Sequence, residues 1–293
     1  MSISLQTIAA IIVSFESTGV LPTCLDALKA EGIAAFVVDN ASNDNSCKVA
    51  SAYGATIISN IQNQGFGRGM NIGAAAANGF EYLLLLNPDA VISKGSMEAL
   101  LLAAQRYPDA GILSPRILSE DGSIFFPTKS LAAPYLHNYK GIKVVPTGDC
   151  CAPFLSGACY LIRRDLFLQL GGFDPNIFLF YEDNDLCRRV IDAGHSVVYV
   201  HDAVISHAQG NSSKPAKGRR FKTRWHYAWS EGYIAHKYNL PNPLFKTFLR
   251  NGLKYLAALV TGNTQKMERY GGSAAGALAF LRGKTALKRE GLK

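Results

Sequence analysis

Short apolar runs alternate with segments of helical periodicity through the first 115 residues. The predicted strands lie at 7–15, 33–39, 56–59, 82–87 and 110–115. The predicted helices lie near 21–30, 46–53, 69–79 and 93–106. The strands are almost continuously hydrophobic, which is typical of a parallel sheet covered by helices on both faces. The sequence therefore predicts an α/β fold with a mostly parallel central sheet flanked by helices.

The second half of the chain is less regular up to about residue 160. Beyond it, 154–173 predicts a strand followed by a short helix, 181–195 predicts a helix that ends at Gly194, and 196–207 predicts another strand. After residue 207 the sequence becomes polar, basic and rich in helix breakers. We therefore expect one α/β domain over 1–210 and a basic helical extension over 211–293.

Charge is distributed unevenly along the chain. The net charge is +8, but residues 214–293 hold 17 Lys and Arg against 3 Asp and Glu, a net +14. This segment could pack on the domain, bind nucleic acid or lie on an anionic membrane. Aromatic residues between the basic ones favour the membrane; they are Trp225, Trp229, Tyr233, Phe245, Phe248 and Tyr255. No recognised nucleic-acid-binding module accompanies them, so we expect no nucleic-acid partner.

The N-terminal sequence lacks the basic start and small-residue cleavage site of a signal peptide, and no apolar run is long enough to cross a bilayer. We expect a cytoplasmic protein at the inner face of the cell membrane. None of the six cysteines forms a Cys-x-x-Cys pair, which disfavours a structural zinc site. The turn after the first strand, SFESTGV, matches neither a dinucleotide-binding nor a phosphate-loop fingerprint.

Polar residues follow the predicted strands at Ser14 and Glu16, at Asp39 and Asn40, at Asn63, and at Asn87 and Asp89. Each is common in turns and helix caps when taken alone. Ligands of such sheets bind outside the carboxyl ends of the strands, so four polar ends indicate a binding site. The segment NQGFGRGMNIG, 63–73, adds glycines that allow close backbone approach and a cation suited to a diphosphate.

Three carboxylates, Glu182, Asp183 and Asp185, lie in the first turn of the helix predicted at 181–195. Negative charges at this position interact favourably with the helix dipole. The dipole in turn favours the ionised form of the carboxylates, which suits a general base. Glu182 and Asp183 are about 100° apart around the helix, so only one is expected to face a given ligand. A lone histidine such as His207 is more often a structural hydrogen-bonding residue than a ligand. If it lies near Asp89, the two side chains would suit a divalent cation.

The ordered motifs VVDNASNDNS, NQGFGRGMNIG, LLLLNPDA, SGACYLIRRDLF, GGFDPNIFLFYEDNDLCRRVIDAGH and ISH resemble those of family 2 glycosyltransferases. The branch they resemble most contains bacterial rhamnosyltransferases and galactofuranosyltransferases of cell-surface polysaccharide synthesis, and the resemblance covers roughly 5–210. It implies a GT-A fold with a nucleotide-sugar half at about 1–115 and an acceptor half at about 116–210. It also implies inverting transfer, with rhamnose as the first guess, from a dTDP- or UDP-linked donor to a glycan or polyprenyl-diphosphate-linked acceptor.

The resemblance also assigns expected roles to residues. Asp183 is the base, with Glu182 beside it. Asp89 and His207 hold Mg²⁺ or Mn²⁺, and the family's Asp-x-Asp motif falls at 87–89 with Asn in place of the first Asp. The expected donor contacts are Ser14, Glu16, Asp39, Asn40, Asn63, Gly65, Arg68, Asn71, Asn87 and Asp89. The expected acceptor contacts are Gly157 and Asp185. Many relatives have Asn where this chain has Glu16.

Two other functions stay open. A sugar-nucleotide-forming nucleotidyltransferase shares the sheet type but normally carries a glycine-rich, basic turn after the first strand. A non-catalytic nucleotide-sugar or glycan-binding relative would explain Asn87, although the presence of Asp89, Asp183 and His207 together opposes it.

Overall fold

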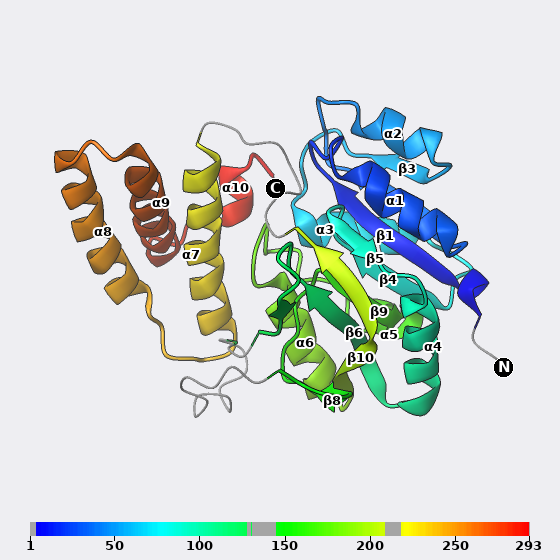
Figure 1. The fold of residues 1–293 in the computed structure, drawn as a ribbon. Helices are drawn as coiled ribbons and strands as arrows, with labels where there is room; N and C mark the ends of the chain where they lie inside the picture. The colour runs from blue at the N-terminus through cyan, green and yellow to red at the C-terminus, as the bar shows by residue number, and fades with distance from the viewer. Residues whose placement is uncertain (1–3, 128–129, 131–144, 209–217, 293) are drawn as a thin grey trace.

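A single mixed sheet forms the centre of the molecule in the computed structural model, which describes residues 4–127, 130, 145–208 and 218–292. The strand order is β3-β2-β1-β4-β9-β6-β10-β5. Figure 1 shows the sheet with helices packed around it. The strands are β1 Ile8–Ser14, β2 Ala34–Asp39, β3 Thr56–Ser59, β4 Tyr82–Leu86, β5 Ala90–Ile92, β6 Ala110–Leu118, β9 Cys159–Arg163 and β10 Ser196–His207. Two short strands pair at the side, β7 Ile124–Phe125 with β6 and β8 Cys150–Cys151 with β10.

The predicted mostly parallel sheet is confirmed. Strand β1 pairs in parallel with β2 and β4, β2 with β3, and β6 with β10. Strand β9 runs antiparallel between β4 and β6, and β5 runs antiparallel to β10. Hydrophobic periodicity carries no information on strand direction, and β5 has only three residues, so neither feature was predicted.

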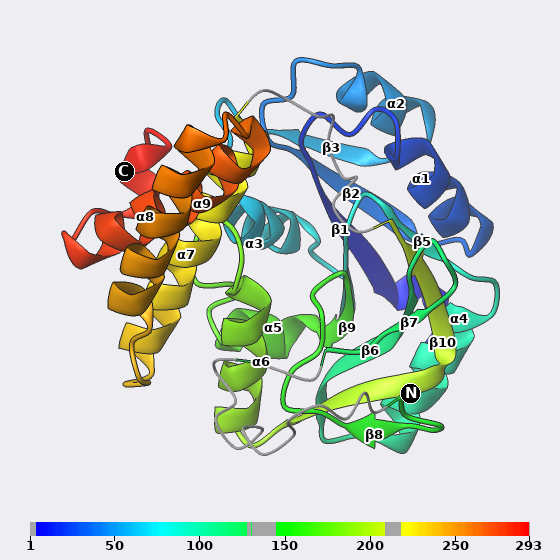
Figure 2. The ribbon, with the colours of Figure 1, turned by 60° about the vertical axis from the view of Figure 1, so that its left-hand side comes forward.

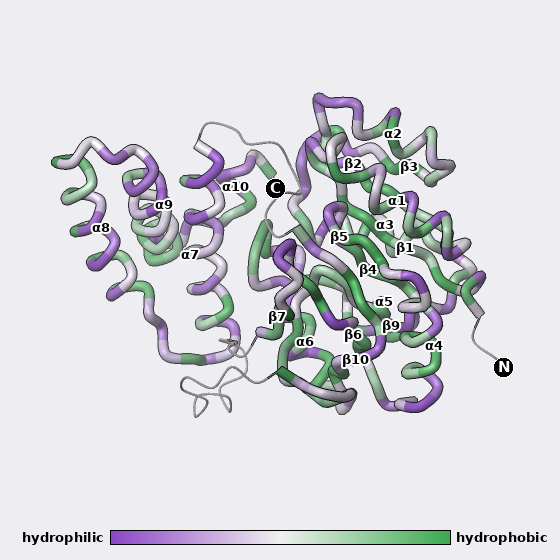
Figure 3. Tube along the Cα trace, in the orientation of Figure 1, coloured by the Kyte–Doolittle hydropathy of each residue, from purple (hydrophilic) through white to green (hydrophobic). Residues whose placement is uncertain are grey.

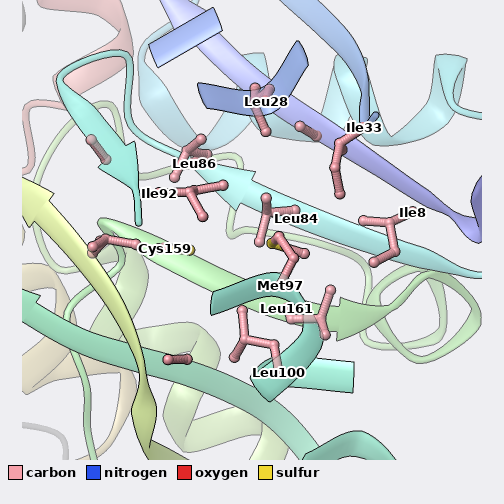
Figure 4. Close-up of a cluster of buried hydrophobic side chains, with 14 of the residues drawn as sticks. Ile8, Leu28, Ile33, Leu84, Leu86, Ile92, Met97, Leu100, Cys159 and Leu161 are labelled. Carbon is pink, nitrogen blue, oxygen red and sulfur yellow. The ribbon is translucent and has the colours of Figure 1, made fainter. Parts of the chain in front are cut away.

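Both faces of the sheet are covered by helices, and β4 lies between the two layers. Leu84 and Leu86 belong to a core shared with α1 (Leu21–Ala30), α2 (Ser46–Ala52) and α4 (Ser96–Arg106) (Figure 4). Leu83 and Leu85 face the other core, shared with α3 (Phe66–Ala76), α5 (Arg164–Gln169) and α6 (Glu182–Asp192). Figure 3 shows the hydrophobic residues concentrated in these central strands. The run of four leucines is therefore buried on both faces.

Helix α3 begins at Phe66, three residues before its predicted start. Its first turns contain Gly67 and Gly69, which disfavour a helix by propensity. Close packing on β1 explains why glycine is tolerated there. A Cβ atom on Gly73 would lie 2.4 Å from Cγ2 of Ile11, and one on Gly69 would lie 2.8 Å from Cγ2 of Val13.

Four helices form the C-terminal region: α7 Arg219–Lys237, α8 Leu244–Val260, α9 Thr264–Leu281 and α10 Ala286–Arg289. They make a layer beside the sheet, with α7 facing the sheet and α8 on the outer side (Figures 1 and 2). Trp225 and Trp229 are buried against Phe178 and Leu287. The interpretation of these two tryptophans as membrane-facing is therefore wrong. Across the described residues, we find no helix with the length and apolar character needed to span a bilayer.

Candidate active site

The polar ends of several strands meet at one edge of the sheet. Ser14 lies beside Asp39 in the register of β1 and β2. Leu86, the last residue of β4, pairs with Cys159, and the backbone N–H of Asn87 donates to the Ala158 carbonyl at 3.0 Å. His207 pairs with Ala90. The predicted convergence of the ends of β1, β2 and β4 is thus present, and β9 and β10 add to the same edge.

Ser14 and Asp39 present two buried oxygens at this edge. Asp39 Oδ2 accepts a hydrogen bond from the Ser42 backbone N–H at 3.0 Å. Asp39 Oδ1 and Ser14 Oγ have no hydrogen-bond partner among the residues that the structure describes. Leaving a buried polar group unsatisfied costs about 1–3 kcal/mol, so the two oxygens are suited to a polar ligand.

Glu16 connects the turn after β1 with the turn after β2. Its φ angle is 54°, its Oε1 accepts from the Asn43 backbone N–H at 2.9 Å, and its own N–H donates to Ser42 Oγ at 3.0 Å. The carboxylate therefore holds the loop that follows Asp39. Glu16 therefore has a structural role in the protein, whether or not it also contacts a ligand.

Two asparagines predicted to contact the donor are instead used within the protein. Asn40 Nδ2 donates to the Gly65 carbonyl at 3.0 Å, and its Oδ1 accepts from Asn60 Nδ2 at 2.8 Å. The amide of Asn71 donates to and accepts from the backbone of Phe173, both at 2.8 Å. The amide groups of both residues therefore have structural partners, and their contacts with a donor stay predictions.

The glycine-rich segment packs against the protein rather than lying open to a ligand. Gly65 has a φ angle of 82°, and an added Cβ atom would lie 2.3 Å from the Phe178 carbonyl oxygen. Asn63 Oδ1 accepts from the Gly65 N–H at 2.9 Å, and Arg68 Nε donates to the Pro175 carbonyl at 2.8 Å. The close approach that Gly65 and Gly67 permit is therefore made by Phe178 and Phe173, whereas Gly69 and Gly73 pack on β1.

Asp89 and His207, the two candidate metal ligands, lie next to each other. His207 Nε2 lies 3.2 Å from Asp89 Oδ1 and also 3.2 Å from Asn87 Nδ2. This nitrogen cannot accept a hydrogen bond from the amide and donate one to the carboxylate at the same time. With Nε2 unprotonated, its lone pair and the carboxylate oxygen together suit a divalent cation.

The donor set fits a cation shared with a diphosphate. Within the described parts of the chain, no group of three or more His, Cys, Asp and Glu side chains converges. Mg²⁺ and similar ions at nucleotides commonly take one or two protein ligands and complete their shell with phosphate oxygens and water. Asp89 and His207 meet that requirement, and they would hold such an ion beside the end of β4.

The carboxylate pair of α6 lies next to the start of β9. Asp183 Oδ2 accepts from the Gly157 N–H at 3.2 Å, and Oδ1 accepts from the backbone and side-chain N–H groups of Asn184 at 2.8 and 3.0 Å. Glu182 is buried, and its Oε2 has no hydrogen-bond partner in the described regions. Gly157 precedes Ala158, whose carbonyl bonds Asn87. The loop before β9 therefore connects Asp183 with the turn that carries Asp89.

Burial changes the titration of this pair. It raises the pKa of Glu182 to about 8, and the nearby charge of Asp183 adds to the shift. Burial also raises the pKa of Asp183, although the hydrogen bonds from Gly157 and Asn184 oppose that rise. Burial therefore opposes the effect of the helix N-terminus, which favours the ionised form of both groups. Burial and mutual repulsion thus oppose ionisation of both carboxyl groups, and of the two only Asp183 accepts hydrogen bonds from neighbouring residues that oppose the rise of its pKa.

A pH-dependent stability difference should follow from Glu182. Its pKa rises from 4.5 to about 8 on folding, so the stability gained from its proton is complete below pH 4.5 and is lost as the pH rises through about 8. Glu182→Gln carries no such proton. Urea denaturation across this range should show a wild-type unfolding free energy that falls relative to the variant as the pH rises. The exposed Glu98→Gln should keep the wild-type slope, and a parallel slope for Glu182→Gln would contradict the assignment.

The side chain of Asp185 is directed into the protein and not toward the sheet edge where an acceptor would bind. Its side chain is fully buried and accepts from Arg189 Nε at 2.8 Å, Lys237 Nζ at 2.5 Å and Tyr238 Oη at 2.8 Å. Lys237 also donates to Asp174 Oδ2 at 2.6 Å. With its oxygens occupied by three donors, Asp185 anchors α6 to α7, and the predicted acceptor contact is not supported.

The chain enters α6 through an unusual backbone that α7 holds in place. Phe180 and Tyr181 have φ angles of 70° and 69°, a region that residues with side chains rarely adopt. The Tyr227 ring contacts both, with centroid distances of 5.7 and 5.1 Å. Ser230 Oγ donates to the Leu179 carbonyl at 3.0 Å. Helix α7 thus positions the first turn of α6, a role with no local signal in the sequence.

The sequence is similar to a known protein family and to characterised relatives. A family model described as "Glycosyltransferase like family 2" matches residues 6–228. The N-acetylglucosaminyl-diphospho-decaprenol L-rhamnosyltransferase of Mycobacterium tuberculosis is 30% identical over 210 residues, which cover 62% of this chain and 68% of that protein. The O-antigen chain rhamnosyltransferase RfbN of Salmonella typhimurium is 25% identical over 240 residues, which cover 76% and 73%.

Two solved structures share the fold. GalNAc-T7 with UDP, GalNAc and Mn²⁺ has a TM-score of 0.57 and 14% identity, covering 82% of this chain and 55% of that chain. The S. aureus TarS 1–349 complex with UDP has a TM-score of 0.53 and 13% identity, covering 94% and 92%. The predicted GT-A fold is confirmed by these similarities.

Proposed function

This chain belongs to glycosyltransferase family 2, and on that premise we propose that it transfers a sugar with inversion from a nucleotide-diphospho-sugar to a hydroxyl group of a glycan or lipid-linked acceptor. One observation carries the proposal. A single edge of the sheet brings together the unsatisfied oxygens of Ser14 and Asp39, the Asp89–His207 pair, and Asp183 held by Gly157.

The donor is proposed to be dTDP- or UDP-linked, with rhamnose as the first candidate sugar. Two relatives are named as rhamnosyltransferases, and both structural neighbours contain UDP. In this proposal Asp39 and Ser14 contact the base and sugar of the nucleotide. Asp89 and His207 would hold Mg²⁺ or Mn²⁺, which when bound neutralises the charge of the leaving diphosphate.

Asp183 is proposed as the general base. It takes the proton of the acceptor hydroxyl while that oxygen forms a bond to the anomeric carbon, and the bond from this carbon to the diphosphate oxygen breaks. A single displacement of this kind inverts the anomeric configuration. The Gly157 N–H orients the carboxylate, and burial raises the pKa of the neighbouring Glu182, which disfavours a second negative charge beside the base.

The acceptor is proposed to be a polyprenyl-diphosphate-linked glycan of cell-surface polysaccharide synthesis. The mycobacterial relative is named for a decaprenol-linked substrate. Such an acceptor lies in a membrane, so the proposal places the enzyme at the inner membrane surface. The basic segment 214–293, with its net +14, is suited to that location.

A screen of nucleotide-sugars tests this function. With Mg²⁺ or Mn²⁺, dTDP-rhamnose or a UDP-sugar should raise the thermal midpoint and be hydrolysed slowly, and Asp89→Asn should weaken both effects. The exposed Asp26→Asn is a matched control that should behave as wild type. Formation of a nucleotide-sugar from a nucleoside triphosphate and a sugar phosphate would support a nucleotidyltransferase instead. Binding without hydrolysis, and without transfer to any acceptor offered, would support a non-catalytic function.

A further inference from the structure

The outer face of α8 is apolar and exposed. The exposed fractions are 64% for Phe245, 47% for Leu249, 69% for Leu253, 58% for Leu256 and 89% for Val260. The spacing of these residues places them along one side of the helix, and we call them the α8 stripe. Residues on the opposite side, Leu244, Thr247, Asn251 and Ala258, are buried.

A row of basic residues runs beside the α8 stripe. Lys246, Arg250 and Lys254 are exposed and recur every four residues, so they lie along one line of the helix next to the stripe. Helix α8 contains no Asp or Glu. The exposed side of α8 therefore combines an apolar surface with positive charge that no acidic residue of the same helix balances.

We propose that the α8 stripe inserts into the headgroup region of an anionic lipid bilayer, with Lys246, Arg250 and Lys254 against lipid phosphates. Apolar side chains beside a basic row are the features that hold a helix in the plane of a bilayer interface. A second copy of the chain fits less well, because two such faces would bring two basic rows together within segments of net +14. The inference deepens the proposed function by naming the surface on which the acceptor is met.

The α8 stripe is connected to the active site through packed helices. Helix α8 packs on α9, and α9 packs on α7. Helix α7 holds residues 179–181 and Asp185 around the first turn of α6. A membrane contact at the α8 stripe would therefore fix the orientation of Asp183 relative to the bilayer.

Vesicle binding by the full chain tests the inference without requiring sugar transfer. We expect sedimentation with phosphatidylcholine vesicles that contain phosphatidylglycerol, weaker binding at high salt, and little binding to phosphatidylcholine alone. Leu253→Glu should abolish binding. The triple variant Lys246→Gln, Arg250→Gln and Lys254→Gln should weaken it by roughly 100-fold, since each basic residue near such a surface contributes about fivefold.

The control is Leu102→Glu, which changes a leucine of α4 that is 55% exposed and should bind vesicles as wild type does. Donor hydrolysis without vesicles should be the same in all α8 variants as in the wild type. If the wild type itself shows no donor hydrolysis, that result counts against the proposed function and not against lipid binding. Equal binding to neutral vesicles, or equal loss in Leu102→Glu, would overturn the inference. So would a concentration-dependent dimer in light scattering that Leu253→Glu disrupts.

Discussion

Asp183→Asn is expected to lower kcat by about 10²–10⁴-fold while leaving donor affinity close to that of the wild type. The amide keeps the size of the side chain and an oxygen that accepts from the Gly157 N–H, but it cannot take the proton of an acceptor hydroxyl. In the proposed mechanism Asp183 acts on the acceptor and does not contact the nucleotide, so the change should spare nucleotide binding. The effect should therefore appear in turnover.

Steady-state transfer to a saturating acceptor, together with calorimetric titration of the nucleotide, separates the two effects. Asp192→Asn is the matched control, because Asp192 lies at the other end of α6 and pairs with Arg188 at the surface. That variant should turn over at nearly the wild-type rate. Full turnover by Asp183→Asn would rule out the proposed mechanism, and equal losses in both variants would indicate damage to the helix.

Lys237→Met is expected to lower the free energy of unfolding by about 3 kcal/mol. Lys237 lies between Asp174 and Asp185, at 2.6 and 2.5 Å. Burial works to raise the pKa of Asp174, but hydrogen bonds and the charge of Lys237 outweigh it and hold that pKa below its usual value. Removing the ammonium group leaves two buried carboxylates without the positive charge that offsets their own. An uncompensated buried charge destabilises the folded state strongly.

Reversible chemical denaturation measures this cost, with the exposed Lys266→Met of α9 as control. Below the unfolding transition, Lys237→Met should also lower kcat more than it changes the donor KM, because α7 holds the helix that carries Asp183. A stability within about 0.5 kcal/mol of wild type, the range of ordinary surface substitutions, would show that this network does not anchor the C-terminal helices.

The strand ends could be predicted because the signal is local. An apolar run such as 82–86 predicts a buried strand, and the polar residues after it must lie at the sheet edge. The approach of His207 to Asp89 was a condition stated from sequence, and the 3.2 Å distance satisfies it. The GT-A fold and the family followed from the order of these motifs.

Several candidate residues have partners inside the protein that the sequence alone does not reveal. The side-chain amides of Asn40 and Asn71 can form hydrogen bonds with a ligand or with backbone groups equally well. Tertiary packing gives them backbone partners, at Gly65 and Phe173. Asp185 is satisfied by Lys237 and Tyr238, more than 50 residues away in sequence. Trp225 and Trp229 were expected at a membrane interface because periodicity does not say which face of a helix is covered.

The most direct test is a crystal structure of the chain with UDP or dTDP and Mn²⁺, in which anomalous scattering locates the metal. We expect one Mn²⁺ bound by Asp89 and by Nε2 of His207, diphosphate oxygens in its coordination shell, and the nucleotide base against Asp39. A nucleotide bound away from the ends of β1, β2 and β4, or a metal that contacts neither Asp89 nor His207, would contradict this expectation.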